Sequence, residues 1–504
     1  MRSCGILLPI SSIPSRYGIG GFSREAYHFV DQLKRAGQSN WQVLPLGPTG
    51  YGDSPYQAFS TFAGNPYYIS LDTLMEEGLL TQEECQEADC GANPGYVDYG
   101  MLYNTRYAVL RKAFSRFQPG KPYSKFVGEN EFWLEDYCLF MALKNKLGGE
   151  CWVNWPEEYK TRQPEAMKAV KEELAEEISF FSFLQYKFMQ QWTALKAYAN
   201  SNGIRIIGDI PIYVAFDNSD AWSNPELFQF DEDCTPTAVA GCPPDAFAED
   251  GQLWGNPLYR WDYHKETGYA WWIERVRQCQ KLYDVIRVDH FRGFDEYYSI
   301  PYGDTTARNG EWEKGPGMDL FNAIEKSLGK LDVIAEDLGT LTDSVIELVK
   351  ESGFPGMKVL QFAFGDDEEN MYLPHNYEPN CVVYTGTHDN NTTKGWYKEM
   401  SPAEREFSKT YMDNYRTAPE EIHWDFIRMA VSSIANLAII PMQDYLGLGS
   451  EARLNFPSTM GENWKWRMLP GQFNEELIER IHQLTVRYGR APKKPLIQVT
   501  EEQA

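Results

Sequence analysis

The chain has 504 residues, of which 43% are hydrophobic and 24% are charged, and its formal net charge is −25. This composition is typical of a globular protein with a large core. Because the balance is strongly acidic and no basic face is apparent, we expect no nucleic acid partner. Anionic lipid headgroups would also be repelled, and no apolar stretch is long enough to span a bilayer, so we expect no membrane partner.

Nine cysteines are scattered along the chain, and none forms a C-x-x-C pair. An odd and scattered set is typical neither of a disulfide framework nor of a zinc site. The first residues include one early arginine, and Pro9 interrupts the apolar run, which is not the pattern of a signal peptide. We therefore expect a protein of the reducing cytoplasm.

Short apolar runs rich in β-branched residues recur along the chain, and helical patterns separate several of them. Runs of this length, bounded by polar residues, glycine or proline, are typical of strands that are buried on both faces. Eight such runs occur: Cys4–Ile10, Trp41–Leu46, Ile204–Ile210, Val285–Val288, Val333–Ala335, Val359–Phe364, Cys381–Thr385 and Leu437–Pro441.

Eight strands that alternate with helices predict an α/β fold, a single catalytic (β/α)8 TIM barrel over residues 1–504. An open, doubly wound sheet is the alternative, but the glycine-rich turn near its first strand ends in Ser23 instead of glycine. We interpret residues 65–200 as a mostly helical insertion after strand two. Residues 216–269 are interpreted as an active-site loop insertion after strand three. Too few residues follow strand eight for a C-terminal β-sandwich.

Acidic residues follow three of the expected strands, at the barrel face that carries the chemistry in this fold. Asp289 comes after the fourth strand, Glu336 after the fifth and Asp389 after the seventh. A single acidic residue is usually a solvated surface group. A carboxylate at a half-buried strand end is costly without a partner, so three of them at one rim predict a functional site.

Two carboxyl groups across a sugar ring are what a retaining reaction at a glycosidic bond needs. One attacks the anomeric carbon, while the other donates a proton to the leaving oxygen and then acts as a base. Arg287 lies two residues before Asp289, so both side chains point to one side of the strand and the guanidinium would keep Asp289 ionised. A purely structural ion pair is the alternative. No such cation precedes Glu336, which fits the acid role.

The three motifs, R-x-D, E-D and H-D, resemble the signature of the α-amylase clan. Their fuller forms resemble glycoside hydrolase family 77, the amylomaltases or disproportionating enzymes, over effectively the whole chain. Amylases of the clan carry a histidine soon after the strand-three aspartate, whereas Asp209 is followed by Ile-Pro-Ile-Tyr, which resembles the transferases. The other matching stretches are 46–57, 208–214, 243–247 and 251–257.

This resemblance implies that Asp289 is the nucleophile, Glu336 the general acid/base and Asp389 the transition-state stabiliser. It implies no cofactor and no metal, and the sequence contains neither an EF-hand loop nor an H-E-x-x-H motif. The supporting and sugar-binding positions that it implies are Arg287, His388, Asp209, Asp245, Ser54, Tyr56, Gln252, Trp254 and Asn463.

The implied activity is that of a 4-α-glucanotransferase, which moves an α-1,4-glucan segment to the 4-hydroxyl of an acceptor. Malto-oligosaccharides and α-1,4-glucans would be both donor and acceptor. Transfer prevails over hydrolysis when the acceptor is held in place and loops exclude water, and residues 216–269 are the candidate for both tasks. The alternatives are an α-amylase-like retaining hydrolase and a non-catalytic glucan-binding protein. The sequence leaves the oligomeric state open.

Overall fold

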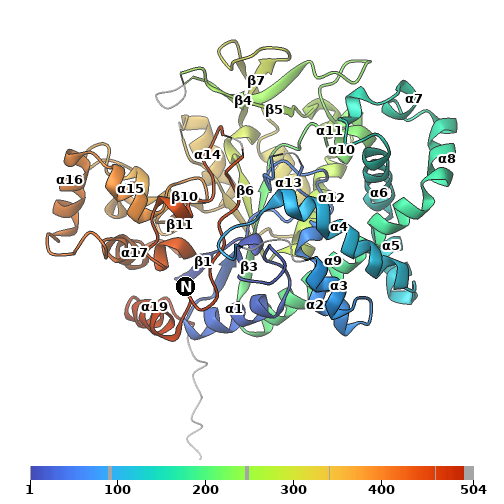
Figure 1. Cartoon of the computed structure of the whole chain (residues 1–504). Helices are drawn as coiled ribbons and strands as arrows, with labels where there is room; N and C mark the ends of the chain where they lie inside the picture. Colours follow the sequence, from blue (N-terminus) through green and yellow to red (C-terminus); the bar gives the residue numbers. More distant parts are fainter. Residues whose placement is uncertain are drawn as a thin grey trace, which may run out of the picture.

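Eight parallel strands close into a barrel at the centre of the molecule (Figure 1). The computed structural model describes residues 2–50, 52–88, 93–244, 249–339, 341–459 and 461–492. Around the barrel the strands follow the order β1-β12-β11-β10-β9-β6-β3-β2, which confirms the expected TIM barrel. The barrel strands are β1 (Ser3–Leu7), β2 (Asn40–Gln42), β3 (Arg205–Pro211), β6 (Val285–Asp289), β9 (Val333–Ala335), β10 (Gly356–Val359), β11 (Cys381–Tyr384) and β12 (Leu437–Pro441).

Some strands are placed differently from the apolar runs that predicted them. β1 stops at Leu7 and β2 at Gln42, before the ends of their runs. The sixth expected strand, 359–364, is wrong, because β10 spans Gly356–Val359 and the chain then enters a 3-10 helix at Leu360–Phe362. Apolar side chains continue beyond β10 since they are buried in the core, and apolarity alone does not separate a strand from a buried turn.

Helices surround the barrel, and those between β2 and β3 form the right-hand part of Figure 1. The longest of them, α9, packs against the neighbouring helices and against β3, so it joins this region to the barrel. α3 begins with a capping box in which Thr81 and Glu84 each accept the other's backbone N–H. The helices between β2 and β3 are α2 (Leu71–Glu76), α3 (Gln82–Glu87), α4 (Tyr99–Arg116), α5 (Lys121–Glu129), α6 (Glu131–Lys146), α7 (Glu157–Lys160), α8 (Pro164–Glu173) and α9 (Ala175–Ser201).

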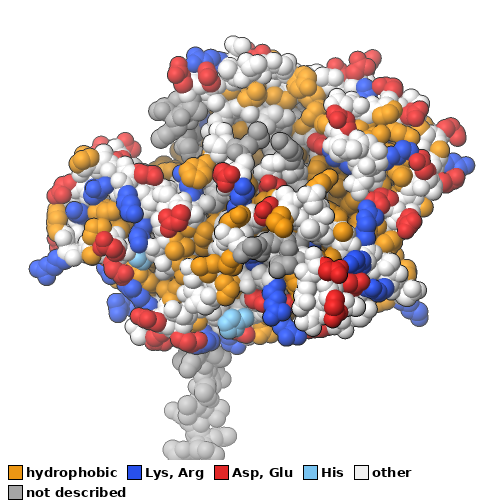
Figure 2. All heavy atoms as spheres, viewed as in Figure 1, with side chains coloured by type: hydrophobic (Ala, Val, Ile, Leu, Met, Phe, Trp, Pro, Cys, Tyr) orange, Lys and Arg blue, Asp and Glu red, His pale blue; other side chains and the backbone are white. Residues whose placement is uncertain are grey.

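The remaining helices follow the other strands. No helix in the described part of the chain is long and apolar enough to cross a membrane. Acidic and basic side chains are interspersed over the face shown in Figure 2. These helices are α1 (Arg24–Arg35), α10 (Ser219–Ser223), α11 (Trp261–Glu266), α12 (Ala270–Leu282), α13 (Met318–Leu328), α14 (Asp343–Ser352), α15 (Thr393–Glu399), α16 (Pro402–Met412), α17 (His423–Ser432), α18 (Met442–Tyr445) and α19 (Glu475–Arg487).

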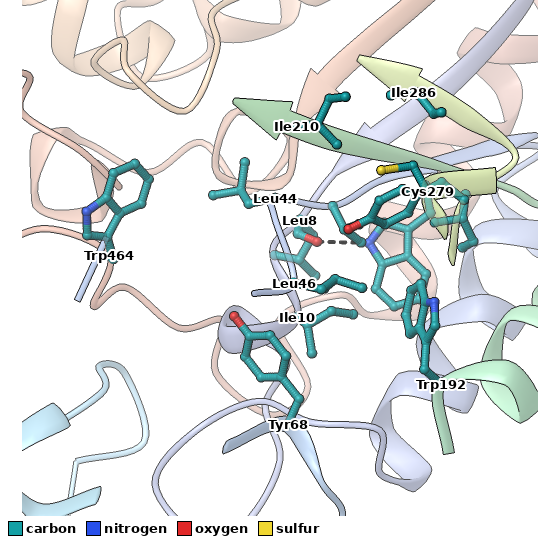
Figure 3. Close-up of a cluster of buried hydrophobic side chains, with 14 of the residues drawn as sticks. Leu8, Ile10, Leu44, Leu46, Tyr68, Trp192, Ile210, Cys279, Ile286 and Trp464 are labelled. Atoms are coloured by element: carbon teal, nitrogen blue, oxygen red, sulfur yellow. Dashed lines mark hydrogen bonds between the residues drawn. The ribbon is translucent and has the colours of Figure 1, made fainter. Parts of the chain in front are cut away.

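Side chains along the barrel strands alternate between the barrel interior and the layer beneath the helices. Val285 on β6 and Ile207 on β3 belong to a cluster that fills the interior, while Ile286 and Ile206, their neighbours in the chain, belong to the outer core. Figure 3 shows part of this outer core, where Ile286 lies in the same cluster as Trp192 of α9. The period of two in a strand therefore builds both layers from one continuous apolar run.

A second sheet, antiparallel and in the order β5-β4-β7-β8, lies at the top of Figure 1. Two of its strands, β4 and β5, come from the segment after β3, and the other two, β7 and β8, come from the segment after β6. The sequence did not predict it, because β4 consists of small residues and β8 is mostly charged, so neither forms a conspicuous apolar run. Its strands are β4 (Ala238–Cys242), β5 (Gln252–Pro257), β7 (Glu296–Pro301) and β8 (Glu311–Lys314).

We expect Gly208→Ala to destabilise the barrel. A Cβ at Gly208 would lie 2.1 Å from the ring of Tyr283, which is itself buried, so β3 or the ring must shift at a cost of about 1–3 kcal/mol. The matched control is Gly128→Ala on α5, where a Cβ meets nothing within 4 Å and alanine is the better helix former. Thermal unfolding followed by circular dichroism checks both, and an unchanged midpoint for Gly208→Ala would contradict the expectation.

Candidate active site

The barrel register brings Asp289 and Glu336 to one rim. Arg287 pairs with Asp209 across β6 and β3, and Val288 pairs with Ala335 across β6 and β9. Asp289 therefore ends β6, and Glu336 directly follows the adjacent strand β9. The Glu336 N–H donates to the Val288 carbonyl at 3.1 Å, which continues the ladder to the rim. Neighbouring strands of a parallel barrel place their C-terminal ends side by side, so two carboxylates face the same space.

A buried guanidinium lies between two carboxylates at this rim. Arg287 Nη1 donates to both oxygens of Asp209, at 2.6 and 2.7 Å, and lies 3.1 Å from Oδ1 of Asp289. The exposed fraction is 3% for Arg287 and 1% for Asp209. Burial lowers the pKa of Arg287, but the charges of Asp209 and Asp289 raise it well above its usual value. The arginine therefore remains a cation, and it serves both carboxylates.

Burial dominates the electrostatics of the two neighbouring carboxyl groups. It raises the pKa of Asp289 to about 6 and that of Glu336 to about 7, and Arg287 opposes both shifts. Glu336 Oε2 accepts the N–H of His290 at 2.8 Å, and Oε1 accepts the N–H of Leu338 at 2.7 Å. Both pKa values are raised toward neutrality, so a state in which the pair holds one proton is available near neutral pH.

A chain of polar contacts links Asp209 to Asp389 across the barrel mouth. The Tyr56 hydroxyl donates to Asp209 Oδ2 at 2.9 Å and lies 3.4 Å from His388 Nδ1, and the two rings stack with centroids 5.1 Å apart. His388 Nε2 lies 3.4 Å from Asp389 Oδ2. Burial alone would lower the pKa of His388, but Asp389 raises it above its usual value. Burial favours a higher pKa for Asp389, yet His388 and a hydrogen bond from Asn455 hold it well below its usual range.

The other expected sugar-binding residues lie at different distances from this network. Ser54 Oγ accepts a hydrogen bond from the backbone N–H of Tyr56 at 3.2 Å, so it helps to position that residue. Trp254 on β5 meets the ring of His290 edge-on, with centroids 4.9 Å apart, and donates its indole N–H to Gln252 at 3.1 Å. Trp254 on β5 therefore contacts His290, the residue directly after Asp289.

Asn463 is not joined to this network by a hydrogen bond in the described part of the chain. Asn463 is buried, and its amide accepts from the N–H of Phe456 at 2.9 Å and donates to the carbonyl of Thr459 at 2.9 Å, so it shapes its own loop. Asp245 lies outside the described residues. In the described part of the chain, no group of three or more His, Cys, Asp or Glu residues could hold a metal ion.

Sequence inspection missed several residues that the fold places here. Trp464 packs against the rings of Tyr56 and His388, with centroids 5.8 and 5.9 Å away, and adopts a left-handed backbone with φ of 66°. That conformation is rare for a bulky residue and persists only where the surroundings hold it. Asn455 and Arg453 contact Asp389. None of these lies beside an acidic motif, and no signal in the sequence could have selected them.

Comparison with known proteins shows the family of the chain. The family model for glycoside hydrolase family 77, described as 4-alpha-glucanotransferase, matches residues 8–472. A 4-alpha-glucanotransferase from Clostridium butyricum is 51% identical over 95% of this chain and 99% of its own length, and one from Thermus thermophilus is 48% identical over 95% and 97%.

A solved structure shows the same likeness in three dimensions. An amylomaltase from Streptococcus agalactiae in complex with acarbose superposes with a TM-score of 0.95 at 41% identity, covering 98% of this chain and 100% of that one. The fold, the carboxylates at the rim and these comparisons agree. The chain therefore belongs to glycoside hydrolase family 77, the retaining 4-α-glucanotransferases.

Proposed function

We propose that Asp289 is the nucleophile, Glu336 the general acid/base and Asp389 a stabiliser of the transition state in the glucan transfer of this family. The observation that carries the assignment is the pair of carboxyl groups at the ends of adjacent strands with different partners: Asp289 lies 3.1 Å from the Arg287 guanidinium, whereas Glu336 accepts two backbone N–H groups. Retaining chemistry needs such a difference, because one group must attack as the anion while the other starts with a proton.

The steps follow from these protonation states. Asp289 attacks the anomeric carbon of the donor, and Glu336 gives its proton to the leaving oxygen, so a covalent glycosyl-enzyme forms and the first product departs. Glu336 is then ionised. It takes the proton from the 4-hydroxyl of an acceptor glucan as that oxygen attacks the same carbon, which releases Asp289 and restores the starting state.

Asp389 remains ionised throughout, since its pKa lies well below the usual range. An ionised carboxylate at the rim can accept hydrogen bonds from sugar hydroxyls, and such bonds strengthen as positive charge develops at the anomeric carbon. We propose that Arg287, Asp209, Tyr56 and His388 orient the sugar and the reacting carboxylates as one connected network.

Malto-oligosaccharides and longer α-1,4-glucans are the proposed donors and acceptors. Residues 216–269 contain β4 and β5, and β5 carries Gln252 and Trp254 to the residue directly after Asp289. An aromatic face there would hold an acceptor sugar and keep water from the glycosyl-enzyme. Hydrolysis in the manner of an α-amylase is not favoured, given the family to which the chain belongs.

We propose the cytoplasm as the compartment in which the enzyme works. Five cysteines in the described part of the chain are buried and form no disulfide: Cys4, Cys85, Cys138, Cys279 and Cys381. Buried thiols without disulfide partners are typical of a reducing compartment. Fractionation of the cells that make the protein checks this.

Asp289→Ala is expected to abolish disproportionation, with a loss of about a thousandfold or more, because no other group can form the covalent intermediate. Separation of the products of maltotriose by length should show glucose and a ladder of longer maltodextrins for the wild type only. Asp284→Asn is the matched control: it lies at the opposite end of β6, where it bonds Asn200 and the N–H of Ile206. Glucose and maltose without a ladder from the wild type would instead indicate hydrolysis.

The pH profile of kcat/KM should be bell-shaped. Activity rises as the pair of Asp289 and Glu336 loses its first proton and falls as it loses the second, and desolvation places both steps above the usual carboxyl pKa range. Glu336→Gln should lose activity on maltotriose but still react with α-maltosyl fluoride, whose leaving group needs no proton. Equal losses on the two substrates would contradict the acid role.

Trp254→Ala is expected to raise the ratio of hydrolysis to transfer about severalfold, because water gains access where the indole held the acceptor. The ratio is measured as glucose released against maltodextrins formed from maltotriose. Leu253→Ala is the control, since Leu253 occupies the adjacent position on β5, points to the other face and is 40% exposed. If both variants keep the wild-type ratio, Trp254 does not control water access.

A further inference from the structure

Asp389 lies on a loop that no strand holds directly. It comes five residues after the end of β11 at Tyr384. Within the loop, Asn390 Oδ1 accepts hydrogen bonds from the N–H and the hydroxyl of Thr387, at 2.8 and 2.9 Å. These bonds shape the loop, but they do not touch the Asp389 carboxylate. Within the loop, His388 faces Oδ2 of this carboxylate at 3.4 Å, and the contact to Oδ1 comes from another part of the chain.

A segment after β12, residues 443–455, supplies several of the contacts that hold this loop from outside. The Asp444 carboxylate accepts from the Thr385 hydroxyl at 2.5 Å, and from both the N–H and the hydroxyl of Thr393 at 2.7 Å. Asp444 is 2% exposed, so these bonds are shielded from water. The two ends of the loop that carries His388 and Asp389 are thus tied to one buried carboxylate.

Arg453 and Asn455, from the same segment, reach Asp389 itself. Arg453 donates through Nη2 to the backbone carbonyl of Asp389 and through Nε to the carbonyl of Asn455, both at 2.7 Å. The Asn455 amide donates to Asp389 Oδ1 at 2.7 Å, while His388 Nε2 faces Oδ2 at 3.4 Å. Because each carboxylate oxygen has a partner of its own, the plane of the carboxylate is fixed.

We propose that Arg453 and Asn455 are positioning residues for glucan transfer, holding the backbone and the carboxylate of Asp389 in the orientation that the transition state requires. The inference rests on the proposed role of Asp389. A carboxylate held in place before the reaction stabilises developing charge without reorganisation, and a small misplacement costs much of that effect. The Asn455 amide also helps to hold the pKa of Asp389 low, so it favours the ionised form.

Asn455→Ala removes the donor to Oδ1. We expect kcat for maltotriose to fall about 10- to 100-fold while KM changes by less than about threefold, because the effect lies in the transition state. Asn455 is half-buried, so the variant should fold, and circular dichroism checks that it does. A kcat within about twofold of the wild type would overturn the proposal.

Asn455→Asp separates positioning from a merely structural role. At neutral pH it sets a second carboxylate against Asp389 Oδ1, whereas at lower pH the pair shares a proton and the hydrogen bond returns. The variant should therefore be less active than Asn455→Ala at neutral pH and regain activity, relative to the wild type, as the pH falls. The other charged groups around the pair are His388, Arg453, Arg287 and Asp289, and all of them are unchanged in both variants. Equal losses at every pH would indicate a structural role and overturn the inference.

Arg453→Lys keeps the charge but cannot bond both carbonyls in the same way, so we expect a loss in kcat of about tenfold. The control is Asn376→Ala, which loses two side-chain bonds to the carbonyls of Glu368 and Asn370 in another loop and should keep full activity.

Asp389→Ala distinguishes the proposed role of Asp389 from the positioning inference. If it remains active, the role of Asp389 is wrong. If it is inactive while the Asn455 and Arg453 variants keep full kcat, only the positioning inference fails.

Discussion

The guanidinium of Arg287, buried on β6, compensates the carboxylates of Asp209, which is buried, and of Asp289, which is partly exposed. Without this cation, the two neighbouring carboxylates would repel each other. Asp209 makes the two shorter contacts and so fixes the direction of the guanidinium. Arg287 also lies 3.1 Å from Asp289, and its charge lowers the pKa of both Asp289 and Glu336, which desolvation raises.

From Asp209 the same network continues through Tyr56 and His388 to Asp389, on the other side of the barrel mouth. Its members come from the loop after β2, from β3 and β6, and from the loop after β11. These groups lie far apart in the sequence and hold one another in place. Desolvation raises the pKa of Glu336 and favours its protonated form, although its two backbone N–H partners oppose the shift, whereas a histidine and an amide hold the pKa of Asp389 low and keep it ionised.

Two kinds of support meet at this site. Asp289 and Glu336 are placed by the ladder between β6 and β9, which is rigid because each strand is bonded on both sides. Asp389 is placed by a loop, and a loop is only as well defined as the contacts that hold it. The segment after β12 supplies those contacts with Asp444, Arg453 and Asn455. The last barrel strand therefore contributes to the site through the segment at its C-terminal end.

Much of the fold could be predicted from the sequence because strand burial is a local property. Eight apolar runs, each able to serve both faces of a strand, favoured a closed parallel sheet over an open one, and in a closed sheet the acidic residues after β6 and β9 reach one rim. Where local signals were weak, prediction failed. β10 was placed too late because buried apolar residues continue past it, and the sheet of β4, β5, β7 and β8 has strands of small or charged residues.

The sequence by itself determined the barrel and the positions of Asp289 and Glu336 within it, because the period of a strand and the register of a parallel barrel depend on neighbours in the chain. Only the tertiary structure decided which groups surround them. The stacking of Tyr56 on His388, the left-handed Trp464 against both rings and the bond from Asn455 to Asp389 join residues tens to hundreds of positions apart. No periodicity encodes such pairs, since they form only when the loops at the barrel mouth pack against one another.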